Sequence, residues 1–394
     1  MAKPLRIIAK TLSGLEQIAA EELKNFGANN IQIMRRSVQC EGDLEFLYKA
    51  NLCSRFVGRF LVQLKVVRIN TKEDLYKAVG SIDWSDYMSP ASLLAIDAIG
   101  TNKIFTNSHY VSLLAKDAVV DQFRKRSGRR PSIDTKRPDL RINVHINQNI
   151  VSIGLDSSNI PLSKRGYRRE GGEAPLSEIL AAGIIKLSGW DRKTPFIDGM
   201  CGSGTFAIEA ALMARNIAPG LIRKSFGFQH WRNYNARLFR QLTEEAKKKI
   251  NREPLPLIIA SDINQKRIDD TLSNAKRAGV LDDLKIDRIA FSDQTPPEEP
   301  GVLIMNPPYG ERIKQEDLDQ LYSSIGDTLK QKYAGYDAFI FSGNSKASKK
   351  IGLRTSQKIE LHNGQLECRL LKFEMYTGSK KEKKTAPPDN DDAV

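Results

Sequence analysis

Alternating strands and helices after about residue 175 constrain the fold of this 394-residue chain more than any other feature. Apolar runs with the length of strands recur between helix-length segments at 195–198, 257–261, 286–291, 301–305 and 337–341. Because a repeated strand–helix unit places successive strands in parallel, this half predicts a parallel sheet with helices on both faces. Asn363-Gly364, between the apolar runs 357–361 and 368–375, predicts a final antiparallel hairpin.

The first 160 residues mix shorter elements of both kinds. Alternating or β-branched apolar runs predict strands at 6–9, 31–38, 59–69, 93–99 and 140–153. Helical spacing of apolar residues predicts helices at 14–26, 44–50, 72–80 and 111–125. We therefore expect a separate α/β region before the parallel sheet.

Several classes of protein are disfavoured by the composition. No apolar run reaches the roughly 18 residues of a membrane span, and the N-terminus lacks the apolar core of a secretory signal. The 4 cysteines lie far apart without a Cys-x-x-Cys pair, and the 4 histidines are equally dispersed. This pattern argues against a disulfide framework or a metal site and favours the reducing cytoplasm.

The positive charge is distributed unevenly along the chain. Lys and Arg number 61 against 47 Asp and Glu, a net charge of +14, and residues 1–170 hold 27 basic and 17 acidic residues. A basic excess concentrated in one half is typical of proteins that bind nucleic acid. The alternative is a solvated basic surface that keeps the protein soluble.

A glycine-rich loop follows the first strand of the parallel sheet, in the segment 198–205 (DGMCGSGT). Its G-x-x-G-x-G order differs from the dinucleotide G-x-G-x-x-G, and no Lys follows the last glycine, which excludes a P-loop. Such glycines let the backbone approach a ligand, and the following helix offers unpaired N–H groups at its N-terminus. The candidate cofactor-binding residues here are Asp198, Gly199, Cys201, Gly202, Gly204 and Thr205.

Two acidic residues follow the next two predicted strands. Asp262 is placed to accept hydrogen bonds from both hydroxyls of a ribose, although an Asp before a helix is also a common N-cap. Asp293 is placed to accept a hydrogen bond from an adenine amino group, with a solvated turn as the alternative. We assign both residues to the cofactor site.

The fourth predicted strand runs into Asn306-Pro307-Pro308-Tyr309, the most specific motif of the chain. The prolines stiffen the backbone, so the Asn306 side-chain oxygen and the Pro307 carbonyl become fixed acceptors for two N–H bonds of an exocyclic amine. The Tyr309 ring offers a face on which an extruded base can stack. We assign all four residues as catalytic and Asn306 also as a cofactor contact, because a weakly nucleophilic amine needs orientation more than a strong base.

Together these motifs resemble class I S-adenosylmethionine-dependent RNA methyltransferases with an N-terminal THUMP domain, close to the guanine-N2 half of the bacterial large-subunit rRNA enzyme. The resemblance covers about residues 3–376 and is carried by DGMCGSGTF, NPPYGER, LSKRGYRREGGEAPLSEILAAG and RNIAPGLIRKSFGFQHW. One departure is Asp198-Gly199, where the family usually has Asp-Pro. It removes a rigid residue but no group that binds the cofactor.

The resemblance implies a doubly wound, Rossmann-like methyltransferase sheet preceded by two smaller α/β units. We expect a ferredoxin-like subdomain at 1–64, a THUMP domain at 65–158 (with a start as early as about 45 left open), a linker at 159–175 and a methyltransferase domain at 176–378. Residues 379–394 lack apolar content and predict a disordered tail.

Two basic clusters are candidates for RNA contact, because basic side chains with an aromatic neighbour suit a phosphate backbone and a stacked base. The alternatives are a solvated helix end for the first cluster and an interdomain latch for the second. The candidate RNA-binding residues are Arg124, Lys125, Arg126, Arg129 and Arg130, followed by Lys164, Arg165, Tyr167 and Arg168.

The resemblance implies a cytoplasmic enzyme that uses S-adenosylmethionine to methylate guanine N2 in 23S rRNA or an assembling large ribosomal subunit, with no membrane partner. The Asn-Pro-Pro-Tyr motif also occurs in adenine-N6 methyltransferases that act on DNA, and the absence of a helix-turn-helix pattern favours RNA. A second alternative is a non-catalytic RNA-binding factor in ribosome assembly.

Overall fold

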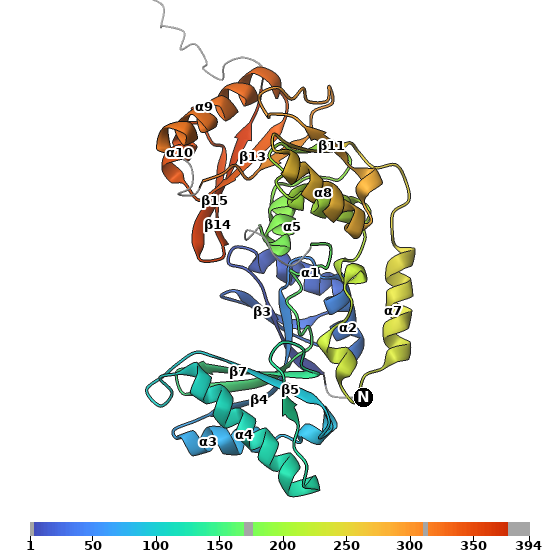
Figure 1. Ribbon diagram of the computed structural model, residues 1–394, viewed down its shortest axis with the longest axis vertical. Helices are drawn as coiled ribbons and strands as arrows, with labels where there is room; N and C mark the ends of the chain where they lie inside the picture. Colours follow the sequence, from blue (N-terminus) through green and yellow to red (C-terminus); the bar gives the residue numbers. More distant parts are fainter. Residues whose placement is uncertain (1–3, 169–175, 310–313, 377–394) are drawn as a thin grey trace, which may run out of the picture.

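Two sheets follow one another along the long axis of the protein (Figure 1). The computed structural model describes residues 4–168, 176–309 and 314–376. The tail expected at 379–394 and most of the basic linker segment after Arg168 lie outside these residues. No helix in the described part of the chain is both long and apolar enough to cross a bilayer.

The N-terminal sheet has the strand order β2-β3-β1-β4-β8-β7-β5-β6. Neighbouring strands are antiparallel, except that β5 pairs in parallel with β6 and β7. The bounds are β1 (Leu5–Lys10), β2 (Asn29–Met34), β3 (Ser37–Gly42), β4 (Arg59–Arg68), β5 (Leu93–Ile99), β6 (Ser132–Ile133), β7 (Leu140–Asn147) and β8 (Ile150–Asp156).

Helices of this half begin and end at residues with clear capping roles. Gly27, with φ of 104°, ends α1, and Thr71 starts α3 through a reciprocal capping box with Asp74. Helices α3 and α4 pack against each other at the end of the molecule away from the C-terminal sheet (Figure 1). The bounds are α1 (Glu16–Phe26), α2 (Leu44–Cys53), α3 (Lys72–Gly80) and α4 (Ser108–Ser127), with a 3₁₀ turn at Trp84–Asp86.

Strand β4 belongs to both parts of the N-terminal sheet. Its residues 59–62 pair with β1 on one side, and its residues 61–68 pair with β8 on the other. The boundary expected between residues 64 and 65 therefore falls within a strand rather than in a linker. The two N-terminal units share one continuous sheet.

The C-terminal sheet confirms the predicted doubly wound architecture, with the order β11-β10-β9-β12-β13-β15-β14. Strands β9 to β13 are parallel, and β15 is antiparallel to β13 and β14, so the Asn-Gly signal correctly predicted the final hairpin. The bounds are β9 (Phe196–Asp198), β10 (Ile258–Asp262), β11 (Lys285–Arg288), β12 (Val302–Met305), β13 (Asp337–Ser342), β14 (Gln357–Asn363) and β15 (Leu366–Glu374).

Helices cover both faces of this sheet, as its parallel order requires. Their bounds are α5 (Glu178–Leu187), α6 (Thr205–Ala214), α7 (Ala236–Lys248), α8 (Gln265–Ala278), α9 (Gln315–Lys332) and α10 (Ser345–Lys349). Short 3₁₀ turns lie at Pro219–Ile222, Gly227–His230 and Leu281–Asp283. The sequence reading did not include α5 or α7. It also placed one strand at 31–38, where the chain instead turns at Arg36, in a left-handed conformation with φ of 56°, and forms β2 and β3.

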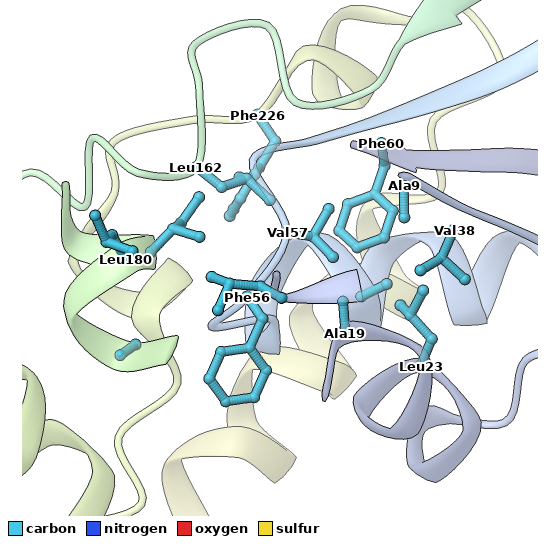
Figure 2. Close-up of a cluster of buried hydrophobic side chains, with 14 of the residues drawn as sticks. Ala9, Ala19, Leu23, Val38, Phe56, Val57, Phe60, Leu162, Leu180 and Phe226 are labelled. Carbon is cyan, nitrogen blue, oxygen red and sulfur yellow. The ribbon is translucent and has the colours of Figure 1, made fainter. Parts of the chain in front are cut away.

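One hydrophobic core crosses from the N-terminal sheet into the C-terminal half. In Figure 2, Leu23 of α1 and Phe60 of β4 share a cluster with Leu162 of the linker, Leu180 of α5 and Phe226. Because the same core contains side chains from both halves, the two halves are held in a fixed relation rather than joined by a flexible connection.

An aromatic cluster strengthens this junction. The ring of Tyr48 on α2 stacks on Phe228 with 4.3 Å between centroids. Phe226 also stacks on Phe228, and Phe239 packs edge-on against it. The Tyr48 hydroxyl accepts a hydrogen bond from the Asn235 backbone N–H at 3.1 Å. The segment between α6 and α8 thus packs against the N-terminal half.

Two linker residues that we expected to contact RNA are buried instead, so this expectation is wrong for them. Arg165 is 1% exposed and donates to the backbone carbonyls of Leu162 and Arg55 at 2.8 and 2.7 Å. Tyr167 is fully buried, and its hydroxyl donates to Glu209 at 3.3 Å. Burial raises the pKa of this phenol well above its usual value.

The physical reason is an acidic partner on α6 that is distant in sequence. Glu209 is fully buried, and its Oε1 lies 3.5 Å from the Arg165 Nε. Arg168 is also engaged internally, because it donates to the Leu176 carbonyl and to the Thr205 hydroxyl and pairs with Glu178. The linker is therefore the interdomain latch, and only Lys164 of this cluster is exposed.

We predict that Arg165→Ala lowers the free energy of unfolding by about 3–5 kcal/mol, because it leaves the buried Glu209 carboxylate without its cation. Calorimetry of the full chain should show a melting temperature several degrees lower. Lys164→Ala, a change at the neighbouring exposed position, should shift stability by no more than about 0.5 kcal/mol. Equal melting temperatures for the two variants would contradict the latch.

Candidate functional site

A cavity of about 720 Å³ lies at the carboxyl edge of the C-terminal sheet. Strand order reverses between β9 and β12, and ligands of open α/β sheets bind at such switch points. The cavity is lined by the glycine-rich loop, the ends of β10 and β12, and part of α9. From the loop these residues are Gly199, Met200, Cys201, Gly202, Ser203 and Thr205.

Two glycines of the loop lie so close to other residues that a Cβ atom would clash there. A Cβ at Gly199 would lie 2.8 Å from the Phe291 ring and 2.9 Å from the Met305 Sδ. Gly204 has φ of 80°, and a Cβ there would lie 2.6 Å from Thr271. Neighbouring protein atoms therefore exclude a side chain at both positions. Gly199 lines the cavity, whereas Gly204, which we expected to contact the cofactor, does not.

Asp262 ends β10 and lines the cavity. One carboxylate oxygen accepts the Gly202 N–H at 3.0 Å, and the other accepts the Asn264 N–H at 2.9 Å. The N-cap of α8 is Asn264, which excludes the alternative role that the sequence left open for Asp262. Because a carboxylate has about four acceptor positions, it retains capacity for two ligand hydroxyls.

Asp198 ends β9 beneath the loop and is 1% exposed. Burial raises the pKa of its carboxyl group well above the usual value, and the nearby Ala207 and Met200 N–H groups offset this only in part. Within the described residues, neither carboxylate oxygen makes a well-formed hydrogen bond. Asp198 does not line the cavity, unlike the cofactor contact that we expected.

Cys201 lines the cavity, but its chemistry is that of a packing residue. Burial raises the pKa of its thiol, next to the Asp198 carboxyl, and the Sγ lies 3.6 Å from the Thr271 hydroxyl. A thiol with a raised pKa is a poor nucleophile.

Asn306 follows β12 and places its side chain at the cavity wall. Its Oδ1 atom is buried and has no hydrogen-bond partner among the residues that the structure describes. Buried acceptors are almost always satisfied, so an orphaned one at a cavity points to a donor supplied by a ligand. Pro307 is buried and does not line the cavity, whereas Pro308 lies exposed at its rim.

Tyr309 is half-buried at the same wall. Its hydroxyl accepts a hydrogen bond from the Asn363 side chain at 3.1 Å, and burial raises the pKa of the phenol. The residues that follow in the motif, 310–313, lie outside the described part of the chain. Asn306, Pro308 and Tyr309 thus share one cavity with the glycine-rich loop and Asp262.

Asp293 differs from its expected placement. Strand β11 ends at Arg288, so Asp293 lies in a turn five residues later, is exposed and does not line the cavity. Phe291 and Ser292 line it instead.

The sequence reading also missed several lining residues. Ile263, immediately after Asp262, is 68% exposed and lines the cavity, which the sequence does not distinguish from an ordinary apolar residue at a strand end. Leu321, Ser324 and Ile325 of α9 and Asn363 of the hairpin complete the wall, and no local pattern marks them.

The first basic cluster is exposed, as expected, but lies far from the cavity. Residues 124–130 form the last turn of α4 and the residues that follow it. Figure 1 shows α4 at the opposite end of the long axis from α9 and β13. Within this cluster Arg124 pairs with Asp121 and Arg126 with Asp83. Lys125 and Arg126 border a smaller hollow between α3 and α4. The described residues contain no cluster of side chains suited to a metal ion.

Comparison with known proteins places these features in a family. Residues 165–372 match the family described as RMKL-like, methyltransferase domain, and residues 70–156 and 6–61 match the THUMP domain and the RlmL ferredoxin-like domain. The chain belongs to the RMKL-like methyltransferases. This family uses S-adenosylmethionine, and the glycine-rich loop together with Asp262, which line the cavity, fits that cofactor.

Relatives of this methyltransferase include complete chains of similar length and longer ones. A Synechocystis protein named "Putative RNA methyltransferase" is 42% identical over 93% of this chain and 96% of its own. The "Ribosomal RNA large subunit methyltransferase K/L" of Syntrophotalea carbinolica is 39% identical over 95% of this chain but 54% of its own, and that of Methylococcus capsulatus is 39% identical over 92% and 50%. The chain thus spans about half the length of the K/L enzymes.

Solved structures agree with this placement. The methyltransferase SMU.472, crystallised with SAH, superposes with a TM-score of 0.85 at 28% identity and covers 96% of this chain and all of its own. A Listeria monocytogenes protein named as a predicted N6-adenine-specific DNA methylase superposes equally well, with 28% identity over 95% of this chain and 97% of its own.

We predict that Asp262→Ala weakens S-adenosylmethionine binding by about 10- to 100-fold, because the carboxylate offers charged hydrogen bonds and also holds the Gly202 N–H. Isothermal titration calorimetry of the full chain measures this. The matched control is Asp282→Ala, which removes an exposed acid of the same domain away from the cavity and should leave the affinity unchanged. The assignment is wrong if both variants bind as tightly as the wild type.

Proposed function

We propose that this protein transfers a methyl group from S-adenosylmethionine to an exocyclic base amine of RNA, namely guanine N2 of large-subunit rRNA. The observation that carries the proposal is the buried Asn306 Oδ1 atom beside the cofactor loop, which no donor in the described part of the chain satisfies. A cavity of about 720 Å³ is large enough for a cofactor together with a base, within the usual size range of ligand sites.

The Asn306 oxygen and the Pro307 carbonyl would accept the two N–H bonds of the amine. An aromatic amine is a weak nucleophile because its lone pair is delocalised into the ring. Acceptors held by rigid prolines would turn those hydrogens away from the ring plane and aim the lone pair into the cavity. S-adenosylmethionine supplies the electrophilic methyl group when bound. The residues of this chain supply orientation and require no strong base.

Tyr309 would hold the base that presents this amine. A base cannot reach a buried acceptor while it is stacked in a helix, so it must be extruded. The Tyr309 ring is half-buried at the cavity wall next to Asn306 and Pro308, where it can stack on such a base.

RNA is favoured over duplex DNA by the N-terminal half. It matches a THUMP domain and holds 27 of the 61 basic residues against 17 acidic ones. Arg124, Lys125, Arg126, Arg129, Arg130 and Lys164 are the exposed candidates for the phosphate backbone. The names of the K/L relatives support rRNA as the substrate class, and that of the Synechocystis protein supports RNA.

The direct experiment is to incubate unmodified large-subunit rRNA, transcribed in vitro, with labelled S-adenosylmethionine and to identify the methylated nucleoside by mass spectrometry. N2-methylguanosine is the expected product. Label on adenine N6 would replace guanine by adenine as the target, and label on a ring carbon or a ribose oxygen would refute the amine mechanism.

We predict that Asn306→Ala lowers the turnover number by about 10²–10³-fold, as loss of one oxyanion-hole hydrogen bond does in other enzymes. The affinity for S-adenosylmethionine should change little, because the amide oxygen serves the amine. Single-turnover kinetics on the rRNA transcript, with calorimetry of cofactor binding, separates the two effects. The exposed Asn233→Ala is the control and should retain full turnover.

We further predict that replacing Arg124, Lys125 and Arg129 together by Ala weakens RNA binding and reduces the slope of log affinity against log salt by about one per lost phosphate contact. Cofactor affinity should not change. The control removes the same charge from the exposed end of α7 by replacing Lys247, Lys248 and Lys249. Equal salt slopes for the two triple variants would show that the end of α4 does not contact RNA.

A further inference from the structure

The C-terminal hairpin enters the active site, although no motif of the sequence assigned it a role there. Its turn follows Asn363, the last residue of β14, and Asn363 lines the same cavity as Asn306 and Tyr309. The Asn363 side chain donates to the Tyr309 hydroxyl across a separation of 54 residues. We propose that Asn363 is a positioning residue that fixes the Tyr309 ring for the incoming base; this role rests on the function proposed above.

The Tyr309 ring is held at two places. Its edge packs near the backbone at the end of β13, since a Cβ at Gly343 would lie 3.2 Å from the ring. Its hydroxyl is fixed by Asn363, and the Cys368 thiol lies beside it. A ring pinned at one edge alone can still pivot about its χ angles, whereas a second contact at the hydroxyl selects one orientation.

The hairpin forms one edge of the C-terminal sheet, so strand pairing fixes its position. It pairs with β13 through β15 over residues 337–342. On its other side it abuts the N-terminal half, because a Cβ at Gly14 would lie 2.8 Å from the Leu361 side chain and 2.9 Å from the Glu360 carbonyl oxygen. Figure 1 shows this hairpin reaching toward α1. The strand that ends at Asn363 is thus held by the C-terminal sheet on one side and by the N-terminal half on the other. A positioning residue requires such support.

This contact changes the expected behaviour of Tyr309. If stacking were the only role of the ring, Tyr309→Phe would be nearly silent. Because the hydroxyl accepts from Asn363, its removal leaves the ring free to turn and leaves the half-buried amide without that partner. The cost should appear in substrate capture rather than in cofactor binding, since neither group belongs to the glycine-rich loop or β10.

The test is a double-mutant cycle in the full-length protein with Asn363→Leu, Tyr309→Phe and the double variant. We expect each single change to raise the KM for the rRNA transcript by roughly three- to tenfold, as loss of one neutral hydrogen bond does. The affinity for S-adenosylmethionine should stay constant. The double variant should be no worse than either single one, because both changes remove the same bond. Gln365→Leu, at an exposed position of the same turn, should behave as wild type.

Thermal unfolding of the same proteins reports the bond without reference to activity. Asn363→Leu should lower the melting temperature in the wild-type background but not in the Tyr309→Phe background. An unchanged KM for Asn363→Leu, or effects that multiply in the double variant, would overturn the positioning role while the wild type still methylates RNA. If the wild type methylates no base amine at all, the proposed function fails, and this role fails with it.

Discussion

The whole structure depends on one apolar core that both halves share. Leu23 and Phe60 from the N-terminal sheet pack with Leu162 and Leu180 from the linker and α5. The buried Arg165–Glu209 pair, at 3.5 Å, then fixes the linker to the helix that begins at the cofactor loop. Because separating two partners of a buried ion pair is costly, the orientation of the RNA-binding half and the position of the loop are set together.

Local patterns in the sequence were sufficient for the doubly wound sheet and its final hairpin. Strand–helix alternation, the glycine loop and the Asn363-Gly364 turn each depend on backbone preferences of neighbouring residues. The same holds for the cavity wall formed by Asp262 and Asn306, because parallel strands bring their carboxyl ends to one edge. The side chains at the carboxyl ends of parallel strands can therefore be predicted from the sequence.

Contacts between distant residues could not be predicted in this way. Arg165 and Tyr167 have the composition of an RNA-binding cluster, and only the buried Glu209 on α6 shows that they face inward. The turn at Arg36 was missed because a left-handed arginine carries no glycine signal. The bond from Asn363 to Tyr309 likewise depends on tertiary packing, which places a hairpin turn beside a strand end.

Strand β4 gives the protein an unusual mechanical property. It is bonded to β1 over residues 59–62 and to β8 over residues 61–68, so bending between the two N-terminal units would break ladder hydrogen bonds in the middle of a sheet. The protein is therefore rigid along its long axis, with the basic end of α4 toward one end and the cavity toward the other. Because the N-terminal half of the protein cannot bend at β4, any adjustment of shape when RNA binds falls to the RNA.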